Sequence, residues 1–187
     1  MKKNIISLSL NLLLLFLFTF QSKASEQAWN IAQEGNKIIL IRHSLAPGGG
    51  DPAGFKIDDC KTQRNLSKKG INQSKKIGKL FKKNNVPVDQ VLSSQWCRCK
   101  DTAKYAFKNY FEFPALNSTF QSSFAKNEPK QLKQLQTFVN NWDGDGGNLV
   151  LITHYSIITA ITNAVPSSGE IVITDKKFNV LSTIPTD

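Results

Sequence analysis

The sequence predicts one α/β domain, a three-layer sandwich with a mostly parallel central sheet and helices on both faces. Two observations support this fold class. Short apolar runs alternate along the chain with longer segments whose apolar residues recur at helical spacing. The runs at residues 38–41 and 149–152 contain only apolar residues, which is expected of parallel strands covered by helices on both faces.

The first 24 residues are predicted to be a secretory signal peptide. A basic start precedes the uncharged apolar stretch 5–20, and small residues up to Ala24 suit cleavage. The stretch is shorter than the roughly 20 residues that a membrane-spanning helix needs. Cleavage would leave a domain of residues 25–187, lower the formal charge from +10 to +7, and leave no stable membrane anchor. We therefore expect a periplasmic or secreted protein.

Each element of the domain is predicted from its local pattern. The predicted strands cover residues 37–41, 88–92, 148–153 and 170–174, and the predicted helices cover residues 66–84, 93–106, 131–142 and 157–163. Ser67 is the expected N-cap of the first helix, and the pair Ser93–Ser94 is the start signal of the second. Residues 143–147, rich in glycine and aspartate, are expected to form a loop.

The positive charge of the domain is expected to form a solvated basic surface, which would still attract anionic substrates. Lysines are spread from Lys56 to Lys133 without one dense block, and aromatic residues do not alternate with them. A single-strand nucleic-acid binder would need such aromatic residues, so no nucleic-acid partner is expected. A basic field does attract anions such as phosphate esters.

The three cysteines predict one disulfide and one remaining thiol. In an exported chain, oxidation of cysteine pairs is expected. Cys97 and Cys99 are too close in sequence to pair with each other, so Cys60 is expected to pair with one of the two. The spacing does not match a zinc site and neither histidine is near it, so we expect no metal and no cofactor.

The chain has only two histidines, and both follow predicted strands. His43 comes just after the strand at 37–41, and His154 just after the strand at 148–153. Ligands of such sheets bind beyond the carboxyl ends of the strands. The sequence therefore predicts that both imidazoles face one site at the same edge of the sheet, with a structural role as the alternative.

Arginine is as rare as histidine, although lysine is abundant. The three arginines are Arg42, directly before His43, then Arg64, and Arg98 in the first turn of a predicted helix. A guanidinium binds phosphate with two hydrogen bonds, and a helix N-terminus adds N–H donors. Such groups would suit phosphoryl transfer, in which one histidine attacks phosphorus and arginines neutralise the oxygens. No carboxylate cluster is present to hold a metal.

Four segments carry a family resemblance, in the order LIRHSLAP, QRNLSKKGINQSKKIG, VLSSQWCRCKDTAKYA and LVLITHYSIITAIT. They resemble the motifs of the histidine phosphatase (phosphoglycerate mutase-like) superfamily, in its small single-domain branch, over about residues 37–174. The resemblance implies that His43 is the phosphorylated nucleophile. It also implies that Arg42, Arg98 and His154 complete the phosphate pocket.

Two further residues are candidate substrate contacts. Ser44 stands where family members commonly have glycine after the R-H pair, and its hydroxyl could contact phosphate. Arg64 precedes the LSKKG segment and is close to the pocket in sequence order. The family does not clearly assign Arg64, and an exposed surface charge is the alternative.

The general acid is the main departure from the family pattern. Phosphoglycerate mutases have a glutamate in an L-N-E segment, where this chain has L-N-S ending at Ser118. A serine hydroxyl cannot protonate a leaving alkoxide as a carboxylic acid does. Glu128 is the candidate replacement. The alternatives are Asp51, Asp58 and Asp59.

The residues and the resemblance together predict an exported, metal-independent phosphatase that hydrolyses phosphomonoesters through a phosphohistidine at His43. The expected partner is a phosphorylated small molecule or glycan. Two alternatives stay open. One is a phosphoanion-binding protein whose catalysis is weakened by the missing glutamate, and the other is a phosphohistidine protein phosphatase, whose leaving group needs less acid assistance.

Overall fold

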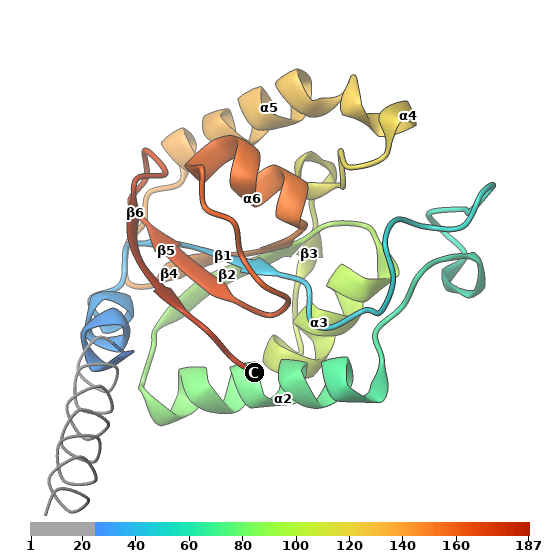
Figure 1. Cartoon of the computed structure of the whole chain (residues 1–187). Helices are drawn as coiled ribbons and strands as arrows, with labels where there is room; N and C mark the ends of the chain where they lie inside the picture. Colours follow the sequence, from blue (N-terminus) through green and yellow to red (C-terminus); the bar gives the residue numbers. More distant parts are fainter. Residues whose placement is uncertain (1–24) are drawn as a thin grey trace, which may run out of the picture.

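The computed structural model describes residues 25–187, so the predicted signal peptide lies outside the described residues (Figure 1). The described chain starts in a helix at residues 25–33. The elements that follow are β1 (Ile38–Arg42), η1 (Cys60–Thr62), α2 (Lys68–Lys83), β2 (Val88–Ser93), α3 (Cys97–Phe107), β3 (Phe111–Glu112), η2 (Pro114–Leu116), α4 (Ser122–Ala125), α5 (Glu128–Asn141), β4 (Asn148–Thr153), α6 (Tyr155–Thr162), β5 (Ile171–Thr174) and β6 (Val180–Ile184). Within residues 25–187, no helix combines the length and the apolar character that crossing a bilayer requires.

One six-stranded sheet divides the domain into layers, with the strand order β3-β2-β4-β1-β5-β6. The first four of these strands are parallel to one another, whereas β5 pairs antiparallel with β1 and β6 pairs antiparallel with β5. Figure 1 shows α2 and α3 on one face of the sheet and α5 and α6 on the other. The predicted three-layer sandwich with a mostly parallel sheet is confirmed.

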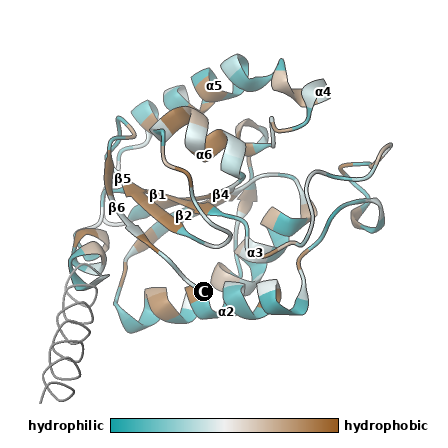
Figure 2. Ribbon diagram, viewed as in Figure 1, coloured by the Kyte–Doolittle hydropathy of each residue, from teal (hydrophilic) through white to brown (hydrophobic). Residues whose placement is uncertain are grey.

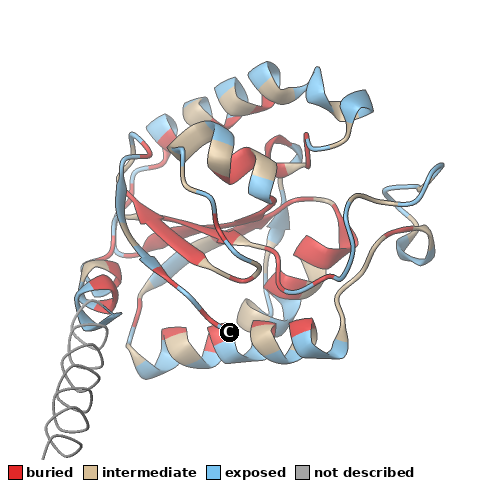
Figure 3. Cartoon of the chain, in the orientation of Figure 1, coloured by how far each residue is buried: buried red, intermediate tan, exposed pale blue. Residues whose placement is uncertain are grey.

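Strands β1, β4 and β5 are apolar except at their ends because both of their faces are covered. In β1, Ile39 and Ile41 pack in the core with residues of α2 and α3, whereas Ile38 and Leu40 pack in the core with residues of α5 and α6. Figure 2 shows hydrophobic strands at the centre of the domain, and Figure 3 shows the same strands buried. This double burial explains why a continuous apolar run predicted β1.

All four predicted strands and all four predicted helices form, with bounds shifted by a few residues. Ser67 is the N-cap of α2, as predicted, and its Oγ accepts a hydrogen bond from the backbone N–H of Gly70 at 3.1 Å. The sequence missed β6 because this outer strand is largely exposed and lacks a continuous apolar run. It also missed β3, which has only two residues.

The predicted start of the helix after β2 was wrong. Ser93 is the last residue of β2, Trp96 is the N-cap, and α3 begins at Cys97. Ser94 lies two residues before the N-cap, where its Oγ accepts a hydrogen bond from the backbone N–H of Trp96 at 3.3 Å and lies 2.9 Å from Nε2 of His154. A serine that looked like a helix signal therefore belongs to the candidate site.

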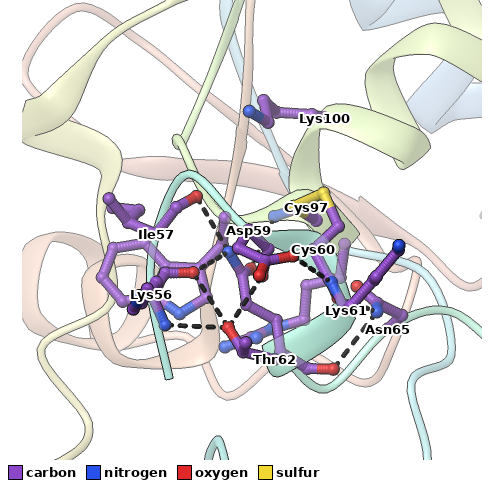
Figure 4. Close-up of a disulfide and its surroundings, with 12 residues drawn as sticks. Lys56, Ile57, Asp59, Cys60, Lys61, Thr62, Asn65, Cys97 and Lys100 are labelled. Carbon is purple, nitrogen blue, oxygen red and sulfur yellow. Dashed lines mark hydrogen bonds between the residues drawn. A yellow bond between two sulfur atoms is a disulfide. The ribbon is translucent and has the colours of Figure 1, made fainter. Parts of the chain in front are cut away.

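A disulfide joins Cys60 to Cys97 and links η1 to the first residue of α3 (Figure 4). The predicted single disulfide is confirmed, its partner is Cys97, and Cys99 is a buried free thiol. Hydrogen bonds order the turn around Cys60: Asp59 accepts from the backbone N–H of Lys61, and Asn65 donates to the carbonyl of Cys60. The bridge therefore fixes a well-defined turn against the start of α3.

We expect Cys60→Ser/Cys97→Ser to lower the free energy of unfolding by about 2–4 kcal/mol, because the sequence separation of 37 residues makes a long closed loop. Denaturant titration measures the change. A reducing agent is the control: it should destabilise the wild type and leave the double variant unchanged. A double variant as stable as the oxidised wild type would contradict this role.

Candidate active site

The carboxyl ends of β1 and β4 bring the two histidines together. The strands are adjacent and parallel, with Arg42 opposite Thr153, so the next residues, His43 and His154, leave the sheet at the same level. Their ring centroids are 5.4 Å apart. Both rings are buried, although both line a cavity. The structure thus places the histidines as the strand pattern predicted.

His43 is held in one tautomer by its own neighbour. Its Nδ1 lies 2.9 Å from the backbone carbonyl of Ser44, which can only accept a hydrogen bond. In the neutral ring Nδ1 therefore carries the proton and Nε2 keeps its lone pair. Burial, followed by the positive charge of Arg98, lowers the pKa of His43 well below its usual value. The imidazole is thus neutral and nucleophilic near neutral pH.

The ring of His154 is held by two neighbouring side chains. Its Nε2 lies 2.9 Å from Oγ of Ser94 and 3.4 Å from Sγ of Cys99. Ser94 is also 3.2 Å from Oδ1 of Asn117, so the direction of that hydroxyl proton sets the tautomer of His154. Burial and then Arg98 lower the pKa of His154 well below its usual value. A bound dianion would oppose this shift, because negative charge favours the imidazolium.

Arg98 is fixed by a buried ion pair. Its Nη1 donates to Oδ1 of Asp51 at 2.8 Å, and both side chains are almost completely buried. Oδ2 of Asp51 accepts a hydrogen bond from the indole N–H of Trp96 at 2.9 Å. Burial alone would raise the pKa of Asp51, but the hydrogen bond and charge of Arg98 outweigh it, and the pKa is lowered. Asp51 therefore stays ionised and orients the guanidinium.

Arg64 connects the glycine loop to the site. Its Nε donates to the carbonyl of Gly50 at 2.8 Å, and its Nη1 donates to the carbonyl of Ala46. Gly48 and Gly50 have positive φ values of 89° and 70°, which glycine adopts without steric cost. Gly48, Gly49 and Gly50 therefore turn the loop, and they also line the cavity.

These groups surround a cavity of about 280 Å³ at the edge of the sheet. Its lining residues are Arg42, His43, Gly48, Gly49, Gly50, Arg64, Arg98, Ser118, Phe120, Gln121, His154, Tyr155 and Ser156. Among residues 25–187, then, no carboxylate lines the cavity. Over the same residues, no three His, Cys, Asp or Glu side chains gather into a group that could hold a metal ion.

Ser44, a predicted substrate contact, does not line the cavity. Its backbone N–H donates to Oγ1 of Thr102 at 3.0 Å, and its Oγ accepts from the hydroxyl of Ser74 at 2.8 Å. The side chain is fully buried against α2 and α3. The structure therefore gives Ser44 packing contacts under the strand end, where its carbonyl orients His43.

The four candidate general acids also lie outside the cavity lining. Glu128 accepts a hydrogen bond from Oγ1 of Thr119 at 2.8 Å, and Asp51 is paired with Arg98. Asp59 caps η1, and Asp58 is exposed. The structure therefore brings none of the four carboxyl groups to the histidines.

Several lining residues had no role in the sequence prediction, among them Tyr155, Phe120 and Gln121. The Tyr155 ring lies under the guanidinium of Arg42, 5.7 Å from its Cζ to the ring centroid. Phe120 lies at the mouth with 64% of its surface exposed, and Gln121 is close to it. Tyr155 could have been predicted to line the cavity because it directly follows His154. Nothing in the local sequence indicates that Phe120 or Gln121 would line it.

The charges of the site suit a dianion. The guanidiniums of Arg42, Arg64 and Arg98 carry three positive charges, and Asp51 supplies one negative charge. With both imidazoles neutral, the three arginines, Asp51 and the two histidines together have a net charge of +2. Nε of Arg42 and Nε of Arg98 are buried without a hydrogen-bond partner, an unusual cost that functional sites often carry. The site is therefore prepared for an oxyanion such as a phosphoryl group.

No protein-family model and no curated protein matches the chain. Several solved structures share its fold. A phosphoglycerate mutase from Thermus thermophilus has a TM-score of 0.53 and 16% sequence identity, over 81% of this chain and 99% of that chain. The protein TTHB049 from the same organism has a TM-score of 0.56 and 16% identity over the same shares of 81% and 99%. The protein histidine phosphatase SixA, complexed with tungstate, has a TM-score of 0.51 and 15% identity, over 78% of this chain and 93% of that chain.

At these identities the likeness concerns the fold. The described domain has the histidine phosphatase (phosphoglycerate mutase-like) fold that the motif resemblance implied.

Proposed function

We propose that this protein is an exported, metal-independent phosphatase that hydrolyses phosphomonoesters through a phosphohistidine on His43. The observation that carries the proposal is the convergence of two imidazoles and three guanidiniums on one small cavity. The hydrogen bond from Nδ1 to the carbonyl of Ser44 leaves Nε2 of His43 free to attack. The positive charge that a metal would supply elsewhere comes here from arginine.

The proposed reaction has two steps. Nε2 of His43 attacks phosphorus, an N–P bond forms, and the P–O bond to the leaving group breaks. Water then attacks the phosphoryl group, phosphate is released, and His43 returns to its neutral form. Arg42 and Arg98 neutralise the phosphoryl oxygens in both steps, and His154 donates a hydrogen bond to one of them once the dianion has favoured its protonation.

The lining of the cavity favours substrates with good leaving groups. Without a carboxyl group at hand, a basic alkoxide would leave unprotonated and therefore slowly. Phenolic esters leave more readily, and the exposed Phe120 at the mouth offers an aromatic contact. A cavity of about 280 Å³ lies near the small end of the range for ligand sites, so it holds little more than the phosphoryl group and its attached ring.

The absence of a carboxyl group from the lining of the cavity also favours a second candidate function, the removal of phosphate from phosphohistidine in a protein. The imidazole leaving group needs less acid assistance than an alkoxide. SixA, which shares the fold, is described as a protein histidine phosphatase. Export would separate this chain from intracellular phosphohistidine proteins, and the disulfide between Cys60 and Cys97 supports an oxidising location.

We expect His43→Ala to lower kcat/KM for an aryl phosphate by at least about a thousandfold, because the nucleophile is removed. Excess EDTA should leave the wild-type rate unchanged. Released phosphate measures both effects, and His43→Asn is the matched second variant. Activity that survives in both variants, or that EDTA abolishes, would contradict the mechanism. Saturable phosphate binding by the wild type without turnover would instead indicate the weakened binding protein.

We expect Asp51→Asn to lower the free energy of unfolding by about 3–5 kcal/mol, because it leaves Arg98 as an unpaired buried charge. The value of kcat/KM should fall by at least about tenfold, since the guanidinium is no longer held in place. Because folding lowers the pKa of Asp51, this stabilisation is fully present at pH values above the ordinary pKa of an aspartate. It is lost as the pH falls from there through the lowered pKa. Exposed Asp58→Asn is the control and should change neither quantity. Equal behaviour of the two variants would refute the role of the ion pair.

We expect Ser118→Glu to supply the missing acid, because Ser118 lines the cavity. The ratio of kcat/KM for an alkyl phosphate to kcat/KM for an aryl phosphate should rise by at least about tenfold, since general acid catalysis helps the poorer leaving group more. Ser118→Gln has the same size without the proton and is the control. If the glutamate and glutamine variants have the same ratio, the leaving-group argument is wrong.

A further inference from the structure

A second, larger cavity lies between the carboxyl-terminal ends of α2 and α3. It has a volume of about 610 Å³, and we call it the lysine groove. Its lining residues are Lys75, Gly78, Lys79, Phe81, Lys82, Asn85, Val86, Val88, Tyr105, Ala106, Phe107 and Lys108. The groove is far from the histidines, because Arg98 in the first turn of α3 and Phe107 at its end are about 14 Å apart along the helix axis.

The positive charge of the groove is not compensated within the protein. No acidic residue lines it, and its four lysines take part in none of the ion pairs among residues 25–187. Across its 16 residues, α2 carries seven lysines and no acidic residue. The helix dipole accounts for cations in the last turn, at Lys82 and Lys83, but not for Lys75 and Lys79 further back. Those two repel each other at i,i+4 spacing, so the charge costs stability.

Apolar side chains are exposed among these lysines. Tyr105 is 38% exposed and Val88 is 36% exposed, and Nζ of Lys75 lies 5.6 Å from the centroid of the Tyr105 ring. Lysine side chains can rest their stems on apolar surface and extend their ammonium groups outward. Exposed aromatic and aliphatic groups within a ring of lysines are typical of a surface that rests on anionic lipid headgroups.

The groove also lies where the chain enters the domain. The helix at residues 25–33 packs beside it: the rings of Trp29 and Phe81 are 5.9 Å apart, and Nε2 of Gln33 donates to the carbonyl of Asn84 at 2.7 Å. The first helix of the described domain therefore lies beside the groove.

We propose that the lysine groove is a docking surface for a bilayer containing anionic phospholipid. The binding is reversible and electrostatic, with the lysines on headgroup phosphates and Tyr105 and Val88 at the interface. The catalytic cavity lies at the other end of α3, so it stays open to solution while the domain is docked. The proposal does not depend on the phosphatase function.

The test compares the wild-type domain, residues 25–187, with two variants of it that carry the same change in charge. The groove variant is Lys75→Gln/Lys79→Gln/Lys82→Gln/Lys108→Gln. The control variant is Lys126→Gln/Lys130→Gln/Lys133→Gln/Lys177→Gln, from elsewhere on the surface. Each is mixed with vesicles of phosphatidylcholine, with or without one third phosphatidylglycerol, and the bound fraction is measured by sedimentation. All three proteins lack residues 1–24, so the apolar stretch does not contribute to binding.

We expect the wild type to prefer the anionic vesicles and to lose that preference at high salt. The groove variant should bind the anionic vesicles at least about tenfold more weakly than the wild type, and the control variant only about twofold more weakly. Equal losses in the two variants, or equal binding to neutral and anionic vesicles, would overturn the proposal. So would a groove variant that loses binding to duplex DNA but keeps binding to vesicles. Thermal unfolding checks that both variants are folded, as exposed substitutions should be.

Discussion

The parallel pairing of β1 with β4 is the constraint on which the rest of the site depends. Both strands are buried on both faces, and their register places Arg42 opposite Thr153, so the next residue of each strand leaves the sheet at the same level. The backbone N–H of His43 extends the pairing by donating to the carbonyl of Thr153 at 2.9 Å. The sheet thus delivers two imidazoles to one point without any flexible segment between scaffold and site, as preorganised catalysis requires.

A second layer of support reaches the site from the loop before α2. Asp51 binds the guanidinium of Arg98. Cys97 directly precedes Arg98, and the disulfide links Cys97 to Cys60 in the same loop. Arg64 completes the connection, because its backbone N–H also donates to Asp51. The arginines that are proposed to bind phosphate are therefore held partly by charge and partly by a covalent link. Oxidation of Cys60 and Cys97 thus contributes to the geometry of the site as well as to stability.

Much of this arrangement could be predicted from the sequence, because local patterns determine strands, helices and the residues at their ends. The meeting of His43 and His154 followed from two apolar runs and a parallel sheet. The pairing of Asp51 with Arg98 could not be predicted, since the two residues are 47 positions apart and no local pattern links them. For the same reason Ser94 looked like a helix cap, although its hydroxyl contacts His154. Long-range packing therefore decides which polar groups beyond the strand ends contact the site.

The proposed mechanism requires a covalent bond between phosphorus and His43 during turnover. The most direct measurement is to quench the wild type with alkali while it hydrolyses an aryl phosphate, and to locate the phosphoryl group by mass spectrometry of its peptides. Alkali preserves phosphohistidine, whereas acid destroys it. The mechanism predicts one phosphoryl group, on His43. A phosphoryl group on any other residue, or rapid turnover with no phosphorylated peptide at all, would contradict it.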